Sequence, residues 1–102
     1  MVESWAVVDV APPPDGMLTT VDVDGTFVAL GRLDGSLVAF DETCTHRACP
    51  LSDGVLADGS ITCPCHKSRF DLRTGTPING PAVEPIRIRQ VREDGGRVHI
   101  ER

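Results

Sequence analysis

Two short stretches of this sequence decide its interpretation: Cys44-Thr45-His46 and Cys63-Pro64-Cys65-His66. Sixteen residues separate them, and all four cysteines and two of the three histidines of the protein lie between Cys44 and His66. Thiolates and imidazoles are the side chains that bind zinc, iron and copper most readily. The two stretches therefore predict a metal site held by two loops, and the remaining sequence predicts the scaffold that presents them.

The segments around these stretches follow the pattern of an antiparallel β-protein. Asp-Gly pairs at 24–25, 34–35 and 58–59 predict hairpin turns, because a type I′ turn needs positive φ at both central residues. No window of ten or more residues has a helical period. We expect an all-β antiparallel sandwich or small barrel, with strands at 4–10, 17–23, 26–30, 37–40, 54–56, 60–62, 68–72, 86–91 and 97–101.

In the last third of the chain, the sequence predicts a loop at residues 76–85 and a strand that begins at Ile86. Residues 76–85 contain three prolines and two further turn formers, which predicts an ordered loop. Arg87 and Arg89 alternate with Ile86 and Ile88, as in a strand with one face in solvent. We therefore expect both arginines to lie on the solvent side of that strand.

The length and charge of the chain limit its class. At 102 residues it is expected to form one domain, residues 1–102. Its net charge of −5 argues against a nucleic acid partner, since phosphates require a basic face, and suits docking on a basic patch of another protein. No apolar run approaches the roughly 20 residues of a membrane helix, and residues 1–10 lack the basic start of a signal peptide. We expect a soluble, cytoplasmic protein with no membrane partner.

Two kinds of metal centre accept two cysteines and two histidines. Zinc binds them with tetrahedral geometry, and zinc ribbons space their ligand pairs by about 15–20 residues. A Rieske [2Fe–2S] centre also takes two cysteines and two histidines, with both histidines on one iron. Classical zinc fingers pair Cys with Cys and His with His on a helix, whereas each stretch here mixes the two types. The mixed order favours the iron–sulfur centre and leaves zinc as the alternative.

The sequence resembles the Rieske family through C-T-H-R-A-C at 44–49 and C-P-C-H-K-S-R-F at 63–70, and the resemblance extends over about residues 28–91. It implies a Rieske-like antiparallel β-sandwich or small barrels, with a two-loop cluster-binding subdomain at about 41–80. It also implies one [2Fe–2S] cluster per chain, with Cys44 and Cys63 on the inner iron and His46 and His66 on the outer one. Neutral imidazoles raise the potential of such a centre to roughly −150 to +300 mV.

The resemblance also implies roles for residues beside these ligands. Cys49 and Cys65 match a pair that forms a disulfide between the ligand loops in high-potential members. Ser68 matches a serine that donates to a bridging sulfide, whereas Phe70 stands where family members have a tyrosine donor. Hydrogen bonds to sulfur stabilise the extra electron. One donor of the usual two therefore implies an intermediate potential.

Other positions depart from the family pattern or complete it. Ala48 and Lys67 stand where glycines are common, and Lys67 would add positive charge beside the cluster. Pro81 matches the proline loop that covers the cluster in family members. His99 lies outside both ligand stretches, in the last expected strand, and is expected to be structural.

The resemblance implies a soluble one-electron carrier that passes electrons from a flavin-dependent reductase to a terminal oxygenase. Such a carrier is a component of an oxidoreductase system, is not itself an enzyme, and binds no small-molecule substrate. The sequence also lacks a 2-His-1-carboxylate site for oxygen chemistry. One alternative is a small Rieske subunit of a dedicated enzyme of the nitrite-reductase or arsenite-oxidase type. Another is a structural zinc module that binds proteins.

Overall fold

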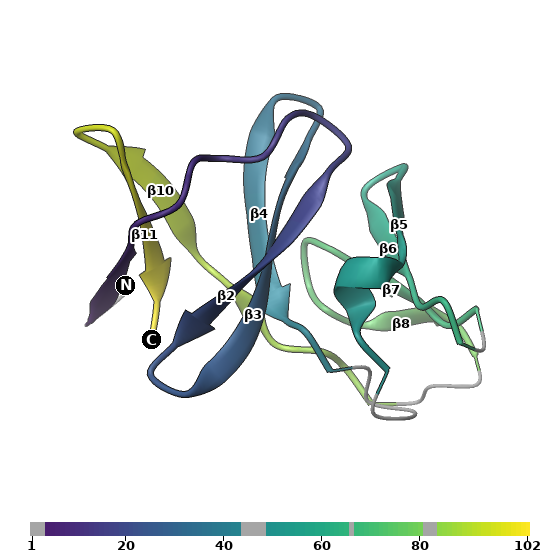
Figure 1. Ribbon diagram of the computed structural model, residues 1–102. Coiled ribbons are helices and arrows are strands. Elements are labelled where there is room, and N and C mark those ends of the chain that lie inside the picture. Colours follow the sequence, from purple (N-terminus) through teal and green to yellow (C-terminus); the bar gives the residue numbers. More distant parts are fainter. Residues whose placement is uncertain (1–3, 44–48, 66, 81–83) are drawn as a thin grey trace.

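The computed structural model describes residues 4–43, 49–65, 67–80 and 84–102 (Figure 1). Within these residues the chain forms strands β1 to β11 and one short 3₁₀ helix, η1, in the order β1 (Trp5–Val8), β2 (Leu18–Val23), β3 (Thr26–Leu33), β4 (Ser36–Asp41), η1 (Leu51–Asp53), β5 (Val55–Ala57), β6 (Ser60–Thr62), β7 (Arg69–Asp71), β8 (Pro77–Asn79), β9 (Ile88–Arg89), β10 (Val91–Asp94) and β11 (Arg97–Glu101). The part of the chain described contains no α-helix, so the predicted all-β class is confirmed. Nor does that part contain a helix long and apolar enough to span a membrane.

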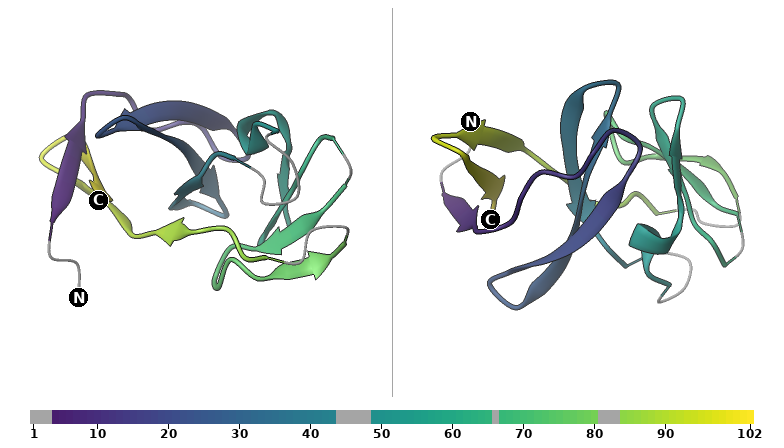
Figure 2. Two further views of the ribbon diagram at one scale, coloured as in Figure 1. Left: turned by 90° about the horizontal axis from the view of Figure 1, so that it is seen from below. Right: turned by 45° about the horizontal axis from the view of Figure 1, so that its top comes forward.

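The strands form three antiparallel sheets, ordered β1-β11-β10, β2-β3-β4-β9 and β5-β6-β7-β8. Figures 1 and 2 show the first sheet at one end of the molecule, the second in the middle and the third at the other end. The molecule measures 39 × 25 × 22 Å along its principal axes. The third sheet, which we call the loop sheet, carries the second ligand stretch between β6 and β7.

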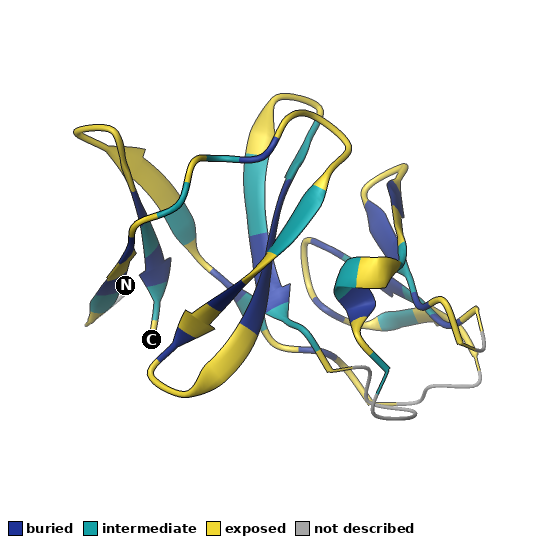
Figure 3. Ribbon diagram, in the orientation of Figure 1, coloured by how far each residue is buried: buried dark blue, intermediate teal, exposed yellow. Residues whose placement is uncertain are grey.

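Strand β3 of the middle sheet is buried on both faces along its central part. In β3 the consecutive residues Val28, Ala29, Leu30 and Gly31 are all buried, as expected of a strand covered on two sides (Figure 3). Val28 and Leu30 belong to a core shared with β1 and β11, whereas Ala29 belongs to a second core shared with the loop sheet. Each face of β3 therefore fixes one end of the molecule to the middle sheet.

The hairpin turns lie where the Asp-Gly pairs predict them. Asp24 and Gly25 have φ values of 52° and 87°, and Asp58 and Gly59 have φ values of 53° and 70°. These are the positive values that a type I′ turn requires at both central residues. The first pair joins β2 to β3 and the second joins β5 to β6, so the turn chemistry sets the register of both hairpins.

Two predictions for the last third of the chain are wrong in part. Residues 76–85 are not only a loop, because they include β8, which pairs with β7. Arg89 is 5% exposed and does not face solvent. Its Nε donates to Asp41 Oδ1 at 2.6 Å and its Nη1 donates to the Glu101 carbonyl oxygen at 2.8 Å. Burial of this guanidinium is compensated because two oxygens accept its hydrogen bonds.

Candidate metal centre

The first ligand stretch begins and ends in residues that are fixed to each other. Thr43 and Pro50 form an isolated antiparallel bridge, and the backbone N–H of Leu51 donates to the Glu42 carbonyl oxygen at 2.7 Å. Residues 44–48, which include the predicted ligands Cys44 and His46, lie outside the described residues. The residues that flank this segment, Glu42 and Thr43 before it and Pro50 and Leu51 after it, are therefore held together.

A carboxylate fastens this loop to the middle sheet. Glu42 Oε1 accepts a hydrogen bond from the Thr20 hydroxyl of β2 at 2.6 Å and another from the Ser52 hydroxyl of η1. Sequence reasoning missed these three residues, because 22 and 10 positions separate Glu42 from its two partners. Isolated Thr, Glu and Ser residues have no pattern that marks such a contact. They nevertheless hold the start and the end of the first ligand loop on one strand.

The second ligand stretch is a tight loop between β6 and β7. The backbone N–H of Cys63 donates to the Ser68 carbonyl oxygen at 2.7 Å, and the N–H of Lys67 donates back to the Cys63 carbonyl oxygen at 3.2 Å. Cys63 is 1% exposed and Ser68 is fully buried. His66, another predicted ligand, lies outside the described residues. The two hydrogen bonds place the Cys63 side chain in the core at the end of the loop sheet.

Lys67 has a backbone conformation that favours glycine. Its φ is +64°, in the left-handed region that L-residues other than glycine, asparagine and aspartate seldom adopt. The loop needs this conformation to bring the Lys67 N–H back to the carbonyl of Cys63. A lysine at this position therefore adopts a conformation that glycine adopts without a steric penalty.

Three sulfur atoms come together where the two loops meet. Cys49 and Cys65 form a disulfide with their Cα atoms 6.5 Å apart, within the usual range. This is the pairing that the family resemblance implies. The Sγ atom of Cys63 and the two disulfide sulfurs all lie within 4.8 Å of one another. The structure thus places Cys49, three residues after the first ligand stretch, beside Cys63 and Cys65 of the second.

Apolar side chains surround the buried thiol. Cys63 belongs to the same core cluster as Leu51, Ile61 and Phe70, each of which is fully buried. An uncompensated thiolate would be costly among such groups, so this position suits a sulfur whose charge is neutralised by a metal. Two thiolates and two imidazoles are the donor set of a Rieske centre. Cys63 is the one predicted ligand among the described residues, and its burial fits such a centre.

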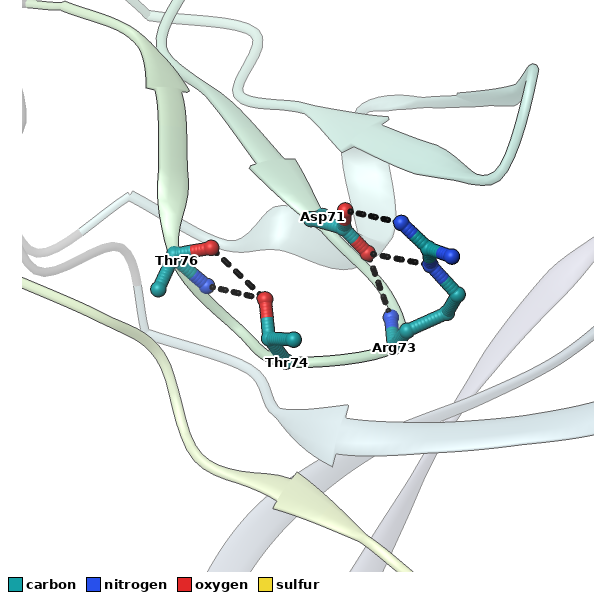
Figure 4. Close-up of polar contacts among 4 residues, drawn as sticks. All are labelled: Asp71, Arg73, Thr74 and Thr76. Atoms are coloured by element: carbon teal, nitrogen blue, oxygen red, sulfur yellow. Dashed lines mark hydrogen bonds and ion pairs between the residues drawn. The ribbon is translucent and has the colours of Figure 1, made fainter.

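Hydrogen bonds within the turn between β7 and β8 hold these two strands of the loop sheet together. Figure 4 shows the Asp71 carboxylate accepting hydrogen bonds from the backbone N–H of Arg73 at 2.7 Å and from its guanidinium, while Thr74 Oγ1 accepts from the Thr76 N–H at 3.3 Å. The Arg73 backbone hydrogen bond, followed by its side-chain hydrogen bond, lowers the pKa of Asp71 below its usual 3.8. This carboxylate is therefore ionised at neutral pH and keeps the turn closed.

A further contact closes the segment that contains β8. The N–H of Ile86 donates to the Gly75 carbonyl oxygen at 2.9 Å, which joins the two ends of residues 76–85. A Cβ atom at Gly75 would lie 2.1 Å from the Ile86 carbonyl oxygen, so only glycine permits this approach. Pro81, the predicted cover of the cluster, lies outside the described residues within this segment.

The sequence matches one protein family over most of its length. The Rieske [2Fe-2S] domain matches residues 4–92. A relative that is 37% identical over 102 residues, covering 99% of this chain and 98% of its own, is the ferredoxin component of the naphthalene 1,2-dioxygenase system of Pseudomonas aeruginosa.

Solved structures agree with this match. The ferredoxin of carbazole 1,9a-dioxygenase from Nocardioides aromaticivorans IC177 has a TM-score of 0.85 at 36% identity, covering 93% of this chain and 96% of its own. A chain in the complex of reduced oxygenase and oxidised ferredoxin of carbazole 1,9a-dioxygenase also has a TM-score of 0.85, at 30% identity, covering 95% of this chain and 92% of its own. The matched fold includes the middle sheet and the loop sheet alike.

Proposed function

The chain belongs to the Rieske [2Fe-2S] domain family, and from this premise we propose that it is a one-electron carrier, which takes electrons from a flavin-dependent reductase and passes them to a terminal oxygenase. The family membership gives it a Rieske-type [2Fe–2S] cluster in place of the zinc alternative. The observation that carries the proposal is the position of Cys63 in the second ligand stretch, where its buried sulfur lies within 4.8 Å of the sulfurs of the Cys49–Cys65 disulfide.

The proposed ligands are Cys44 and Cys63 for the inner iron and His46 and His66 for the outer one. The burial of Cys63 supports this order, because it is 1% exposed and surrounded by apolar side chains. When bound, the cluster accepts and releases a single electron. The protein holds Cys63 rigidly through the hydrogen bond from its backbone N–H to Ser68, so that little rearrangement accompanies the change in charge.

The partners follow from the relatives with which the chain aligns end to end. One is a ferredoxin component of a dioxygenase system, and another comes from a complex with its oxygenase. We extend this to a reductase as the electron source and an oxygenase as the acceptor. The chain would act as a single domain, residues 1–102, in the cytoplasm, as a component of an oxidoreductase system that has no small-molecule substrate of its own.

The first test of this proposal is the iron and acid-labile sulfide content of the purified protein, with an EPR spectrum after reduction. We expect about two irons and two sulfides per chain and a Rieske-type signal. The variants Cys63→Ser and His66→Ala should lose the signal, while His99→Ala should keep it, since His99 lies on β11 in the sheet farthest from the loop sheet. Zinc without labile sulfide would contradict the assignment.

The second test concerns the partners. The reduced protein is mixed with the terminal oxygenase of a Rieske dioxygenase system, and its reoxidation is followed by absorbance. Single-turnover reduction of the oxygenase supports the carrier proposal. Constant co-purification with one large subunit, without transfer to any separate oxygenase, would instead favour the dedicated-subunit alternative.

A further inference from the structure

Glu42 is hydrogen-bonded to three other elements, through its backbone and through its side chain. Its backbone N–H donates to the Phe27 carbonyl oxygen of β3 at 3.2 Å, and its carbonyl oxygen accepts from the Leu51 N–H of η1 at 2.7 Å. Its Oε1 accepts from the Thr20 hydroxyl of β2 at 2.6 Å and from the Ser52 hydroxyl of η1. These contacts attach the residues on both sides of positions 44–48 to the middle sheet.

The Cys49–Cys65 disulfide attaches the same part of the chain at a second point. Cys49 directly follows positions 44–48, and Cys65 lies in the second ligand stretch. The disulfide therefore joins this part of the chain to the second ligand stretch, whereas Glu42 joins it to the middle sheet. Because the cytoplasm, where we place this chain, keeps most thiols reduced, the hydrogen bonds of Glu42 would have to act there without the disulfide.

We propose that Glu42 is a positioning residue, which keeps the predicted ligands Cys44 and His46 in place when the disulfide is reduced. This inference rests on the proposed function, because it takes both residues as cluster ligands. Glu42 precedes Cys44 by two positions, so a shift of its backbone moves the start of the ligand stretch directly. Loss of its carboxylate would leave that backbone free of β2 and of the η1 side chain.

Thr20 offers a way to test this role from outside the ligand stretches. It is exposed on β2, and its hydroxyl reaches Glu42 Oε1 at 2.6 Å and Ser52 Oγ at 3.2 Å. Thr20→Val removes this donor and keeps the size of the side chain. Thr19→Val is the matched control, because successive side chains of a strand point to opposite faces. An effect of Thr20→Val on the metal centre would therefore be transmitted through Glu42 and Ser52.

The test uses the cluster-loaded full chain with Cys49→Ser and Cys65→Ser, which cannot form the disulfide. Metal released to 4-(2-pyridylazo)resorcinol, which binds both iron and zinc, is followed by absorbance. We expect Glu42→Ala to speed the release at least about tenfold and Thr20→Val about threefold, since hydrogen bonds to a carboxylate are stronger than neutral ones. Glu42→Gln should release metal at nearly the unaltered rate, because its amide oxygen accepts the same hydrogen bonds.

Two comparisons separate positioning from a general loss of stability. Asp22→Ala removes a carboxylate that accepts from the Gly25 N–H at 2.7 Å in the turn between β2 and β3. This variant and Thr19→Val should keep the unaltered release rate and EPR spectrum, whereas Glu42→Ala should broaden the EPR lines of the reduced cluster. Equal release from Glu42→Ala and Asp22→Ala, or no recovery in Glu42→Gln, would overturn the proposal.

The disulfide-bonded protein completes the experiment. With the disulfide intact, Glu42→Ala should speed the release less than about threefold, and equal acceleration in the two backgrounds would contradict the idea of two separate attachments. If the double serine variant does not load metal, the disulfide of the native sequence is reduced with tris(2-carboxyethyl)phosphine instead. Failure of the proposed function has a different outcome. Zinc released from the unaltered protein would contradict the cluster, while the comparison of release rates would stay valid because the chelator reports either metal.

Discussion

In the second ligand loop, Lys67 has a positive φ, a backbone conformation that residues with a Cβ atom seldom adopt. Its φ of +64° lets its N–H return to the Cys63 carbonyl, but a Cβ atom in this region costs about 1–2 kcal/mol. Glycine has no such penalty and loses about 0.5–1 kcal/mol through its greater freedom in the unfolded chain. The balance favours glycine on stability alone.

We therefore predict that Lys67→Gly raises the free energy of unfolding of the cluster-free protein by about 0.5–1 kcal/mol. Urea denaturation followed by the fluorescence of Trp5, the only tryptophan, would measure this change. Lys67→Ala is the matched control, because it removes the same side chain and keeps the Cβ atom. Equal stabilisation by both variants would show that the lysine side chain, and not the backbone angle, is responsible.

Ser68 and Phe70, at the start of the loop sheet's third strand, are expected to influence the midpoint potential of the cluster. Both side chains are fully buried, and Phe70 belongs to the same core as Cys63. If the Ser68 hydroxyl donates to cluster sulfur, a hydrogen bond of about 1 kcal/mol corresponds to about 40 mV for a one-electron couple. Ser68→Ala is then predicted to lower the midpoint potential by about this amount, and Phe70→Tyr to raise it.

A redox titration of the cluster-loaded protein measures both changes. Ser60→Ala is the matched control, since Ser60 is 2% exposed and its hydroxyl donates to the Ala57 carbonyl oxygen at 2.8 Å. It should affect stability without moving the potential. Unchanged potentials in both Ser68→Ala and Phe70→Tyr would contradict the assigned roles.

At the scale of the element, the turn between β7 and β8 depends on Gly75. Its φ is +81°, and an added Cβ atom would lie 2.1 Å from the Ile86 carbonyl oxygen. Backbone atoms on both sides would have to move apart, which would break the hydrogen bond that joins the ends of residues 76–85. This contact is absent from any local sequence pattern, although the glycine itself marks a turn.

Gly75→Ala is predicted to lower the free energy of unfolding by at least about 3 kcal/mol, because strain at positive φ adds to a backbone clash. Gly95→Ala serves as the control in a matched conformation. Its φ is +60°, and a Cβ atom there would meet nothing within 4 Å. Its cost should be only about 1 kcal/mol. Similar losses in the two variants, measured by urea denaturation, would show that the approach of Ile86 has no role.

At the scale of the molecule, Arg89 joins two sheets. Its guanidinium donates to Asp41 of the middle sheet and to the Glu101 carbonyl of β11, which belongs to the first sheet. Truncation of Arg89 leaves these two oxygens without a strong donor. Because the Asp41 side chain is 31% exposed, water offsets part of the loss.

Arg89→Ala is predicted to lower the free energy of unfolding by about 2 kcal/mol while leaving the midpoint potential of the cluster unchanged. Arg73→Ala provides the comparison, because its side chain is 86% exposed in its ion pair with Asp71 and its removal should cost at most about 0.5 kcal/mol. A shift in potential with Arg89→Ala would indicate that the first sheet influences the loop sheet.

The sequence by itself determined the features that depend on neighbouring residues. The Asp-Gly pairs specified the hairpin turns, since the φ values they require concern only two consecutive positions. The strand expected at 97–101 is present as β11, in which Val98 and Ile100 are fully buried. The two ligand stretches indicated the family, because the cluster needs those donors at that spacing.

Only the tertiary structure decided the contacts between distant segments. Arg89 looked like a solvent-facing residue of an alternating strand, yet its strand, β9, lies at the edge of the middle sheet, and the hydrogen-bond partners of Arg89 are 48 and 12 positions away in the sequence. The prolines of residues 76–85 predicted a loop, although β8 in this segment pairs with β7. Thr20, Glu42 and Ser52, which hydrogen-bond to one another beside the first ligand loop, belong to no sequence motif. The closeness of Cys63 to the disulfide likewise arises from the meeting of two loops. Such contacts depend on which surfaces the sheets bury together, and local patterns do not encode that choice.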